Sequence, residues 1–136
     1  MPEIKRIHHI AVAVENIDTA LRFWRDMLGI EPTQITNAPQ ESAQIAFLPL
    51  GETEIELVQP TTPDSGMSRF LEKHGPGMHH LCLEVDDLNA WLEKLKAGGV
   101  ILINEQLKVG EDGRLYAFIH PKSTHGVLLE LYQLPK

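Results

Sequence analysis

The sequence predicts an α+β fold made of two copies of one module, in which a strand is followed by a helix and about three further strands. The run His8–Ile17 returns at His79–Leu88, and the run Glu54–Pro60 is echoed by Leu128–Pro135. Each half combines one stretch of helical periodicity with several short alternating runs, which are typical of strands. The two halves together predict a curled mixed sheet with a metal-binding cleft.

The first module is expected to begin with a strand over about residues 7–14 and to continue into a helix. Asp18 is predicted to cap this helix and Gly29 to end it. Short alternating runs then predict strands over about residues 44–50 and 53–59. The apolar stripe of the predicted helix consists of Ala20, Phe23, Trp24, Met27 and Leu28.

The second module repeats this plan. Its helix is predicted to start near Asp87 or Asn89 and to end at Gly98–Gly99. Strands are expected over about residues 100–104, 115–120 and 127–132. The apolar stripe of this helix consists of Leu88, Trp91, Leu92 and Leu95.

The 136 residues are short enough for one domain, which the repeat divides. We expect module one over about 5–60, a linker with a short amphipathic helix over 61–77, and module two over about 78–134. The single cysteine, Cys82, lies in an apolar strand and excludes an internal disulfide, so we expect a buried, unreactive thiol.

Composition excludes several classes of partner. The formal charge is -7 and no stripe of Lys or Arg stands out, so nucleic-acid binding is not expected. With 43% hydrophobic and 23% charged residues the chain has the balance of a soluble globular protein. No apolar run is long enough to span a membrane and no signal peptide is visible, so the expected location is the cytoplasm.

A histidine and a glutamate recur at matching places in the two halves. Because side chains alternate across a strand, His9 faces away from the bulky Ile10 and Val12 and shares its face with small alanines. His80 is likewise in phase with Cys82. The same alternation separates Glu56 and Glu130 from the apolar residues on either side of each.

Two imidazoles and two carboxylates make a ligand set for a borderline divalent ion such as Co²⁺, Zn²⁺, Ni²⁺ or Mn²⁺. The alternative is that His9 and His80 are satisfied strand-end histidines and the glutamates are solvated. The recurrence of both residue types in register favours the metal. His8 and His79 also recur, but they are in phase with the apolar face and are expected to have structural roles.

Three stretches give the chain a resemblance to the vicinal oxygen chelate superfamily, and within it to the methylmalonyl-CoA epimerase family. These stretches are His8–Val14, Gly77–Asp87 and, most specifically, His120–Leu131. The resemblance covers nearly the whole chain. It implies that His9, His80 and Glu130 are metal ligands, and that Glu56 stands where members carry Gln or Glu. It also implies a homodimer.

The resemblance implies a metal-dependent epimerase that interconverts the (2R) and (2S) forms of methylmalonyl-CoA. The α-proton would be removed and returned through a metal-stabilised enolate, with Co²⁺ as the expected ion. Glu130 is expected to be one base. Some epimerases have a glutamate on the strand where this chain has Gln44, and an amide cannot shuttle protons, so Glu56 is the first candidate for the second base and Glu41 a distant second.

An acyl-CoA substrate would also need anion contacts. Lys122 and Ser123 follow His120–Pro121 in a predicted loop, and an ammonium and a hydroxyl there would suit the substrate carboxylate or the CoA phosphates. The alternative for this loop is a turn with a surface lysine.

Other members of the superfamily offer competing functions. Glyoxalase I uses nearly interchangeable ligands and proton-transfer chemistry, although the stretch His120–Gly126 favours an anionic CoA substrate. A metal-free small-molecule-binding resistance protein of the same fold would not need His9, His80 and Glu130 together. An extradiol dioxygenase is less favoured, because an uncharged catechol gives Lys122 and Ser123 no role.

Overall fold

The computed structural model describes residues 2–110 and 112–135, and its chain divides into two compact lobes. The first lobe is His9–His79, and the second lobe combines Met1–His8 with His80–Lys136. Strand β1 (Ile4–Ala13) therefore begins in the second lobe and ends in the first, whereas β5 (Gly77–Val85) begins in the first and ends in the second. Both crossings fall inside the repeated histidine pairs, between His8 and His9 and between His79 and His80.

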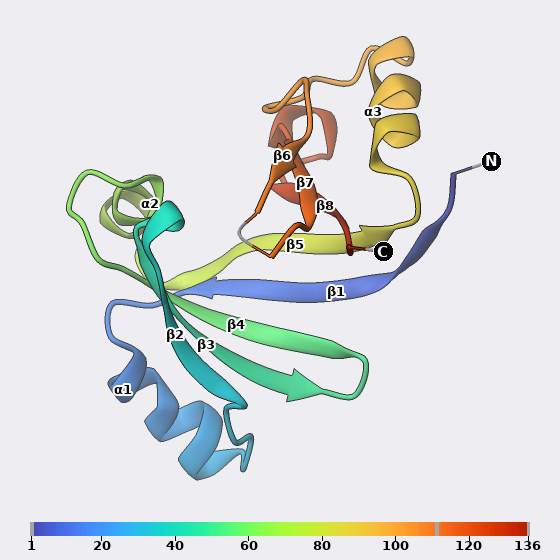
Figure 1. Cartoon of the computed structure of the whole chain (residues 1–136). Helices are drawn as coiled ribbons and strands as arrows, with labels where there is room; N and C mark the ends of the chain where they lie inside the picture. Colours follow the sequence, from blue (N-terminus) through green and yellow to red (C-terminus); the bar gives the residue numbers. More distant parts are fainter. Residues whose placement is uncertain (1, 111, 136) are drawn as a thin grey trace. The chain divides into compact units, whose positions relative to one another are not determined.

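The first lobe follows the predicted order of strand, helix and three strands (Figure 1). Its strands lie in the order β2-β3-β4-β1, in which β1 and β4 are parallel and the other neighbours are antiparallel. After the end of β1 come α1 (Ile17–Leu21), the π-helical turn η1 (Arg22–Met27), β2 (Gln34–Ala38), the 3₁₀ turn η2 (Pro39–Glu41), β3 (Ala43–Leu50), β4 (Thr53–Pro60) and α2 (Gly66–His74).

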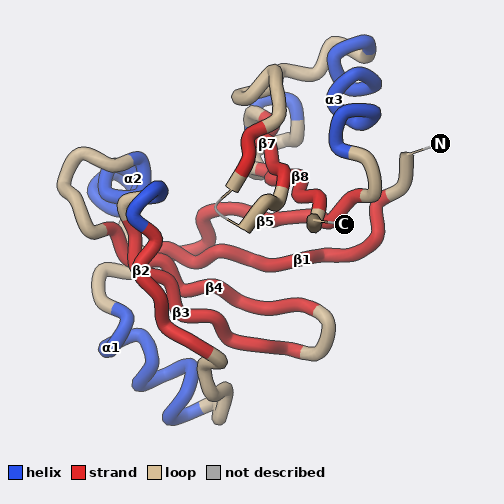
Figure 2. The backbone as a smooth tube through the Cα atoms, viewed as in Figure 1, coloured by secondary structure: helices blue, strands red, loops and turns tan. Residues whose placement is uncertain are grey.

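The second lobe repeats the plan, and helices remain few beside strands in both (Figure 2). Its strands lie in the order β5-β8-β7-β6, again with one parallel pair, β5 with β8. After β5 come α3 (Leu88–Ala97), β6 (Lys108–Val109), β7 (Leu115–Ile119), the 3₁₀ turn η3 (Pro121–Ser123) and β8 (Leu129–Gln133). The predicted α+β class and the duplicated module are confirmed.

The helix starts are built twice in the same way. The Asn16 side chain accepts from the Thr19 N–H at 2.9 Å, and the Asp87 side chain accepts from the Ala90 N–H at 3.1 Å. The cap predicted at Asp18 is therefore wrong by two residues, and the one at Asp87 is confirmed. A glutamine three residues after each repeated glutamate adds a second bond, since Gln59 Oε1 accepts from the Ile17 N–H and Gln133 Oε1 from the Leu88 N–H, both at 2.8 Å.

Each lobe has its own core between sheet and helix. In the first lobe the core comprises Val14, Ile17, Leu21, Ala46, Leu48 and Leu57. In the second it comprises Val85, Leu88, Leu92, Ala117, Ile119 and Leu131. The opposite face of the first-lobe sheet carries a smaller cluster of Ala11, Ala43, Ile45 and Val58, against which Met67 of α2 packs. The stripe predicted for the second helix is confirmed, since all four of its residues lie in or pack against the second-lobe core. The stripe predicted for the first helix is only partly right, because Ala20 and Trp24 pack against the first-lobe core whereas Phe23, Met27 and Leu28 are more than half exposed.

The first residues of β1 are fastened to the second lobe. The Glu3 N–H donates to Asp86 Oδ1 at 2.8 Å, which lowers the pKa of the Asp86 carboxyl. The Asp86 N–H donates to the Glu3 carbonyl in return. Further along β1, Arg6 Nε donates to Glu84 Oε1 at 2.8 Å. The N-terminal segment is thus an integral part of the second lobe.

Three local predictions need correction. Residues 100–104 form no strand, only an isolated bridge between Leu102 and Ile119, because the Asn104 side chain takes the Phe118 N–H that a ladder would use. Strand β2 was not predicted, since its residues show little apolar alternation. The first helix changes to π-helical winding after Leu21.

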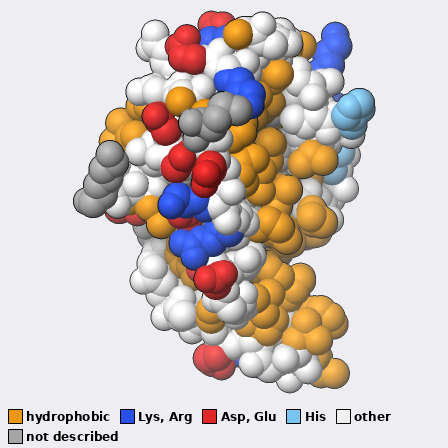
Figure 3. Space-filling view, turned by 90° about the vertical axis from the view of Figure 1, so that its right-hand side faces the viewer, with side chains coloured by type: hydrophobic (Ala, Val, Ile, Leu, Met, Phe, Trp, Pro, Cys, Tyr) orange, Lys and Arg blue, Asp and Glu red, His pale blue; other side chains and the backbone are white. Residues whose placement is uncertain are grey.

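Charged side chains of both signs are mixed on the surface, as the absence of a Lys or Arg stripe in the sequence predicts. On the face in Figure 3, Lys and Arg side chains are interspersed with Asp and Glu, and hydrophobic side chains also reach the surface. No helix among residues 2–110 and 112–135 combines the length and apolarity that a membrane crossing requires.

We expect Leu57→Ala to lower the free energy of unfolding by about 2–5 kcal/mol, because Leu57 is 0% exposed in the first-lobe core. The matched control is Leu50→Ala on the neighbouring strand, where the side chain is 44% exposed and the loss should stay below about 1 kcal/mol. Urea unfolding of both variants checks the prediction, and equal losses would contradict the described core.

Candidate functional site

The first lobe holds one buried histidine–glutamate pair. His9 Nδ1 lies 3.2 Å from Glu56 Oε2, and the two residues are only 4% and 8% exposed. His9 comes from β1 and Glu56 from the parallel strand β4 beside it. Burying an imidazole and a carboxylate costs free energy unless each has a polar partner or a metal. The contact between His9 and Glu56 gives each group such a partner.

The second lobe holds the matching pair. His80 Nε2 lies 3.1 Å from Glu130 Oε1, and their side chains are 11% and 9% exposed. His80 comes from β5 and Glu130 from its parallel neighbour β8. These two ligand atoms are close enough to bind the same ion. The four residues predicted as ligands therefore form two pairs, one in each lobe.

The strand register explains why the pairs recur. In the first lobe Glu56 stands opposite Ala11, two residues after His9, and in the second lobe Glu130 stands opposite Cys82, two residues after His80. Ala11 and Cys82 are both fully buried and small, so they leave room for the imidazole and the carboxylate to meet across them.

On its other side each glutamate faces a phenylalanine across an antiparallel pair. Phe47 stands opposite Glu56, and Phe118 opposite Glu130. In the second lobe the contact extends to the histidine, since the rings of Phe118 and His80 meet edge to face with centroids 5.3 Å apart. An aromatic ring therefore limits access of water to the second pair.

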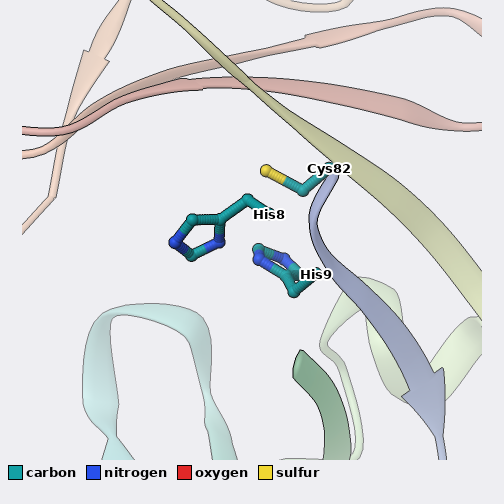
Figure 4. A group of neighbouring side chains, drawn as sticks. All are labelled: His8, His9 and Cys82. Carbon is teal, nitrogen blue, oxygen red and sulfur yellow. The ribbon is translucent and has the colours of Figure 1, made fainter. Parts of the chain in front are cut away.

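The neighbouring histidines pack against aromatic rings. His8 stacks on Tyr132 with ring centroids 4.3 Å apart, and His79 meets Phe70 edge to face at 4.9 Å. These contacts support the structural roles predicted for both. Figure 4 shows that His8 and His9 leave β1 at consecutive positions and that Cys82 stands on β5. The Cys82 thiol is buried and unoxidised, and one His8 nitrogen lies within 4.8 Å of its sulfur.

Gln44 lies on the face of β3 that is opposite to the Glu56 face. Its neighbours Ala43 and Ile45 pack in the small cluster with Ala11, whereas Ala46 lies in the α1 core. By alternation Gln44 shares the α1 side, as does its cross-strand partner Gln59. Gln44 is thus removed from the His9–Glu56 pair, and Glu41 lies in an exposed 3₁₀ turn.

Lys122 and Ser123 lie in the turn η3, as their loop prediction requires. The Lys122 N–H donates to His120 Nδ1 at 3.0 Å, and the Lys122 side chain is exposed. Ser123 Oγ accepts from the Ile101 N–H at 2.9 Å, which ties the turn to the segment after α3. Ser123 therefore has a structural contact in addition to any role toward a ligand.

A group of polar and aromatic residues beside the second pair was not predicted. Glu84 is 6% exposed and paired with Arg6, and Tyr132 is 8% exposed, with burial raising the pKa of its hydroxyl. Arg114 lies over the rings of Tyr116 and Tyr132. One signal was available in the sequence. Glu84 is a charged residue on the same face of its strand as His80 and Cys82, and the same alternation argument identified Glu130.

Comparison with known proteins gives a consistent result. Residues 8–118 match the model of the Glyoxalase/Bleomycin resistance protein/Dioxygenase superfamily. The chain is 37% identical over 132 residues to the mitochondrial methylmalonyl-CoA epimerase of Mus musculus, covering 96% of this chain and 74% of the relative. It is also 37% identical over 133 residues to the ethylmalonyl-CoA/methylmalonyl-CoA epimerase of Cereibacter sphaeroides, covering 96% and 99%.

Solved structures agree with the sequence relatives. One neighbour is a methylmalonyl-CoA epimerase in complex with methylmalonyl-CoA and NH4+. It superposes with a TM-score of 0.88 at 29% identity, over 96% of this chain and 95% of the other. The duplicated fold is therefore shared along nearly the whole length of both chains.

We expect Glu56→Gln to weaken the binding of Co²⁺ at least about 10-fold, because the neutral amide loses the charge of a ligand. Gln44→Ala should change the affinity less than about 2-fold, because Gln44 lies on the α1 side of the sheet. Isothermal titration of both variants measures this. A large effect of Gln44→Ala together with a small effect of Glu56→Gln would contradict the assignment of faces.

Proposed function

The chain belongs to the methylmalonyl-CoA epimerase family of the glyoxalase, bleomycin-resistance and dioxygenase superfamily, whose epimerases are isomerases, and we propose that it interconverts the (2R) and (2S) forms of methylmalonyl-CoA. The observation that carries the proposal is the repeated buried pair, His9 with Glu56 and His80 with Glu130. Relatives named for this activity and a neighbour bound to methylmalonyl-CoA support the substrate.

The two pairs are proposed to serve as the four ligands of one divalent ion. Two imidazole nitrogens and two carboxylates suit a borderline divalent ion, and we propose Co²⁺, with Zn²⁺, Ni²⁺ and Mn²⁺ as the other ions of matching chemistry. Within each pair the nitrogen and oxygen are 3.2 and 3.1 Å apart. Each pair would therefore present two donor atoms side by side to an ion. When bound, such an ion supplies positive charge that stabilises the enolate oxygen.

Epimerisation requires that a proton leave one face of the α-carbon and return to the other. We assign removal of the α-proton to Glu130 and delivery of a proton to the opposite face of the α-carbon to Glu56, with the roles exchanged in the reverse direction. The C–H bond on one face breaks as its proton passes to Glu130, and a new C–H bond forms on the other face. A well-placed acid or base contributes about 10²- to 10⁴-fold to such a step.

Burial suits both glutamates to this task. Each is under a tenth exposed, so neither carboxyl group is surrounded by bulk water that would exchange its proton before transfer. Glu56 stands beside the apolar cluster of Ala11 and Val58, and Glu130 beside Phe118 and Tyr132. The second base therefore does not have to come from Gln44 or from the exposed Glu41.

Further proposals concern the rest of the substrate and the assembly. We assign the exposed Lys122 ammonium to a CoA phosphate and the Ser123 hydroxyl hydrogen to the substrate. We also propose a homodimer in the cytoplasm. Exposed apolar side chains such as Met27, at 76%, and Met78, at 68%, are what a subunit interface would cover.

We expect the metal-loaded protein to exchange the α-proton of methylmalonyl-CoA in deuterated water, with turnover of a hemithioacetal near background. Glu130→Gln should lower the exchange rate about 10²- to 10⁴-fold, because the amide cannot accept the proton. Glu72→Gln, on the exposed side of α2, is the matched control and should leave the rate unchanged. Hemithioacetal turnover without exchange would assign the chain to glyoxalase chemistry instead.

We expect titration with Co²⁺ to give one ion per chain, and His80→Ala to abolish this binding altogether. The reason is that His80 is one of the proposed ligands, and an alanine provides no atom that can bind the ion. His74→Ala, an exposed histidine on α2, should retain full stoichiometry. If His80→Ala still binds one ion with unchanged affinity, the two pairs act separately, and a metal-free binder would show no ion in any variant.

A further inference from the structure

Arg114 lies on the same face of the second lobe as the His80–Glu130 pair. On β7 the residues Leu115, Ala117 and Ile119 belong to or pack against the α3 core, so Tyr116 and Phe118 face the other way. The rings continue this face as a row. The centroids of Tyr116 and Phe118 are 6.3 Å apart, and those of Phe118 and His80 are 5.3 Å apart. Arg114 extends the row at its far end, with its guanidinium carbon 5.8 Å from the Tyr116 centroid.

The guanidinium of Arg114 is held from several sides. It lies 5.7 Å from the Tyr132 centroid, and its Nη1 lies 3.2 Å from Asp112 Oδ1. The backbone of Gly110 packs so closely that an added Cβ would come within 2.8 Å of Arg114 Cγ. A side chain positioned by two aromatic rings, a carboxylate and a glycine has already lost most of its rotamer freedom, so it would bind a ligand at a lower entropic cost.

The position of Arg114 limits what it would bind. Its guanidinium lies over Tyr132, which is two residues from Glu130 along β8, or roughly 7 Å. The carboxylate of a malonyl thioester is bonded directly to the reacting α-carbon. The CoA phosphates are separated from that carbon by the whole pantetheine arm. A planar fork of N–H donors on the same face as the proposed base matches the carboxylate in geometry.

From this placement we infer that Arg114 binds the free carboxylate of the acyl group and makes the site selective for acyl-CoA thioesters that carry an α-carboxylate. The inference rests on the proposed function for its substrate class and adds the residue that sets selectivity. Gly110, Tyr116 and Tyr132 act as positioning residues.

The test compares malonyl-CoA with acetyl-CoA, which differ only in the carboxylate. Both are titrated into the full chain in the presence of Co²⁺, and the dissociation constants are measured by calorimetry. We expect Arg114→Gln to weaken malonyl-CoA about 10- to 100-fold and acetyl-CoA less than about 2-fold. Arg114→Lys should fall between the wild type and Arg114→Gln, because a lysine keeps the charge and loses the planar fork.

Two further variants separate positioning from general damage. Gly110→Ala keeps Arg114 in the sequence but displaces its side chain. This variant should therefore weaken the binding of malonyl-CoA and not of acetyl-CoA, by a smaller factor than Arg114→Gln. Arg25→Gln removes a partly exposed arginine that is paired with Asp26 at 2.9 Å and should change neither constant. Equal weakening of both thioesters by Arg114→Gln, as a contact to the CoA phosphates would give, or no change in either, overturns the inference.

The α-proton exchange rate of the wild type keeps the two proposals distinguishable. If the wild type exchanges the α-proton but substitution of Arg114 does not change the preference for malonyl-CoA, only the assignment of Arg114 is refuted. Arg114-dependent selectivity without exchange or epimerisation supports that assignment and refutes the proposed activity.

Discussion

The register of two parallel strand pairs is the constraint on which the candidate site depends. β1 beside β4 and β5 beside β8 each place a glutamate opposite a small residue that follows a histidine by two positions. A shift of either pair by one residue would turn the glutamate to the helix side, where it would be buried among leucines. The apolar residues on the helix faces therefore fix the polar residues on the other faces, and the fold and the site are specified by the same alternation.

Repetition of this register produces halves that are alike near the pairs and different beside them. In the first lobe the pair adjoins the apolar Ile45, Val58 and Met67, and Glu54 stands opposite His9. In the second lobe the corresponding face carries Glu84, Tyr132 and Arg114. Duplication thus accounts for the two matching histidine–glutamate pairs, and later divergence accounts for the different residues beside them.

The sequence was sufficient to predict the module, the two helices and the four candidate ligands. Alternation is visible within a few residues, and the repeat is visible when the two halves of the sequence are compared. It could not show that Gln44 lies on the helix side, since the phase of β3 depends on its pairing with β4. Nor did it indicate Arg114, which precedes β7 and whose role follows from Tyr132 on another strand. The strand expected at 100–104 does not form, because the Asn104 side chain accepts from the Phe118 N–H in place of a backbone carbonyl.

The path of the chain between lobes has a consequence for how such a protein could arise. Residues Met1–His8 complete the second lobe, and the end of the first lobe, Gly77–His79, opens the strand that the second lobe continues. A gene encoding one module would therefore make a polypeptide whose leading segment belongs on another copy. Its stable form would be a pair that exchanges these segments, and fusion of two such genes would convert an intermolecular exchange into the covalent crossings at the paired histidines.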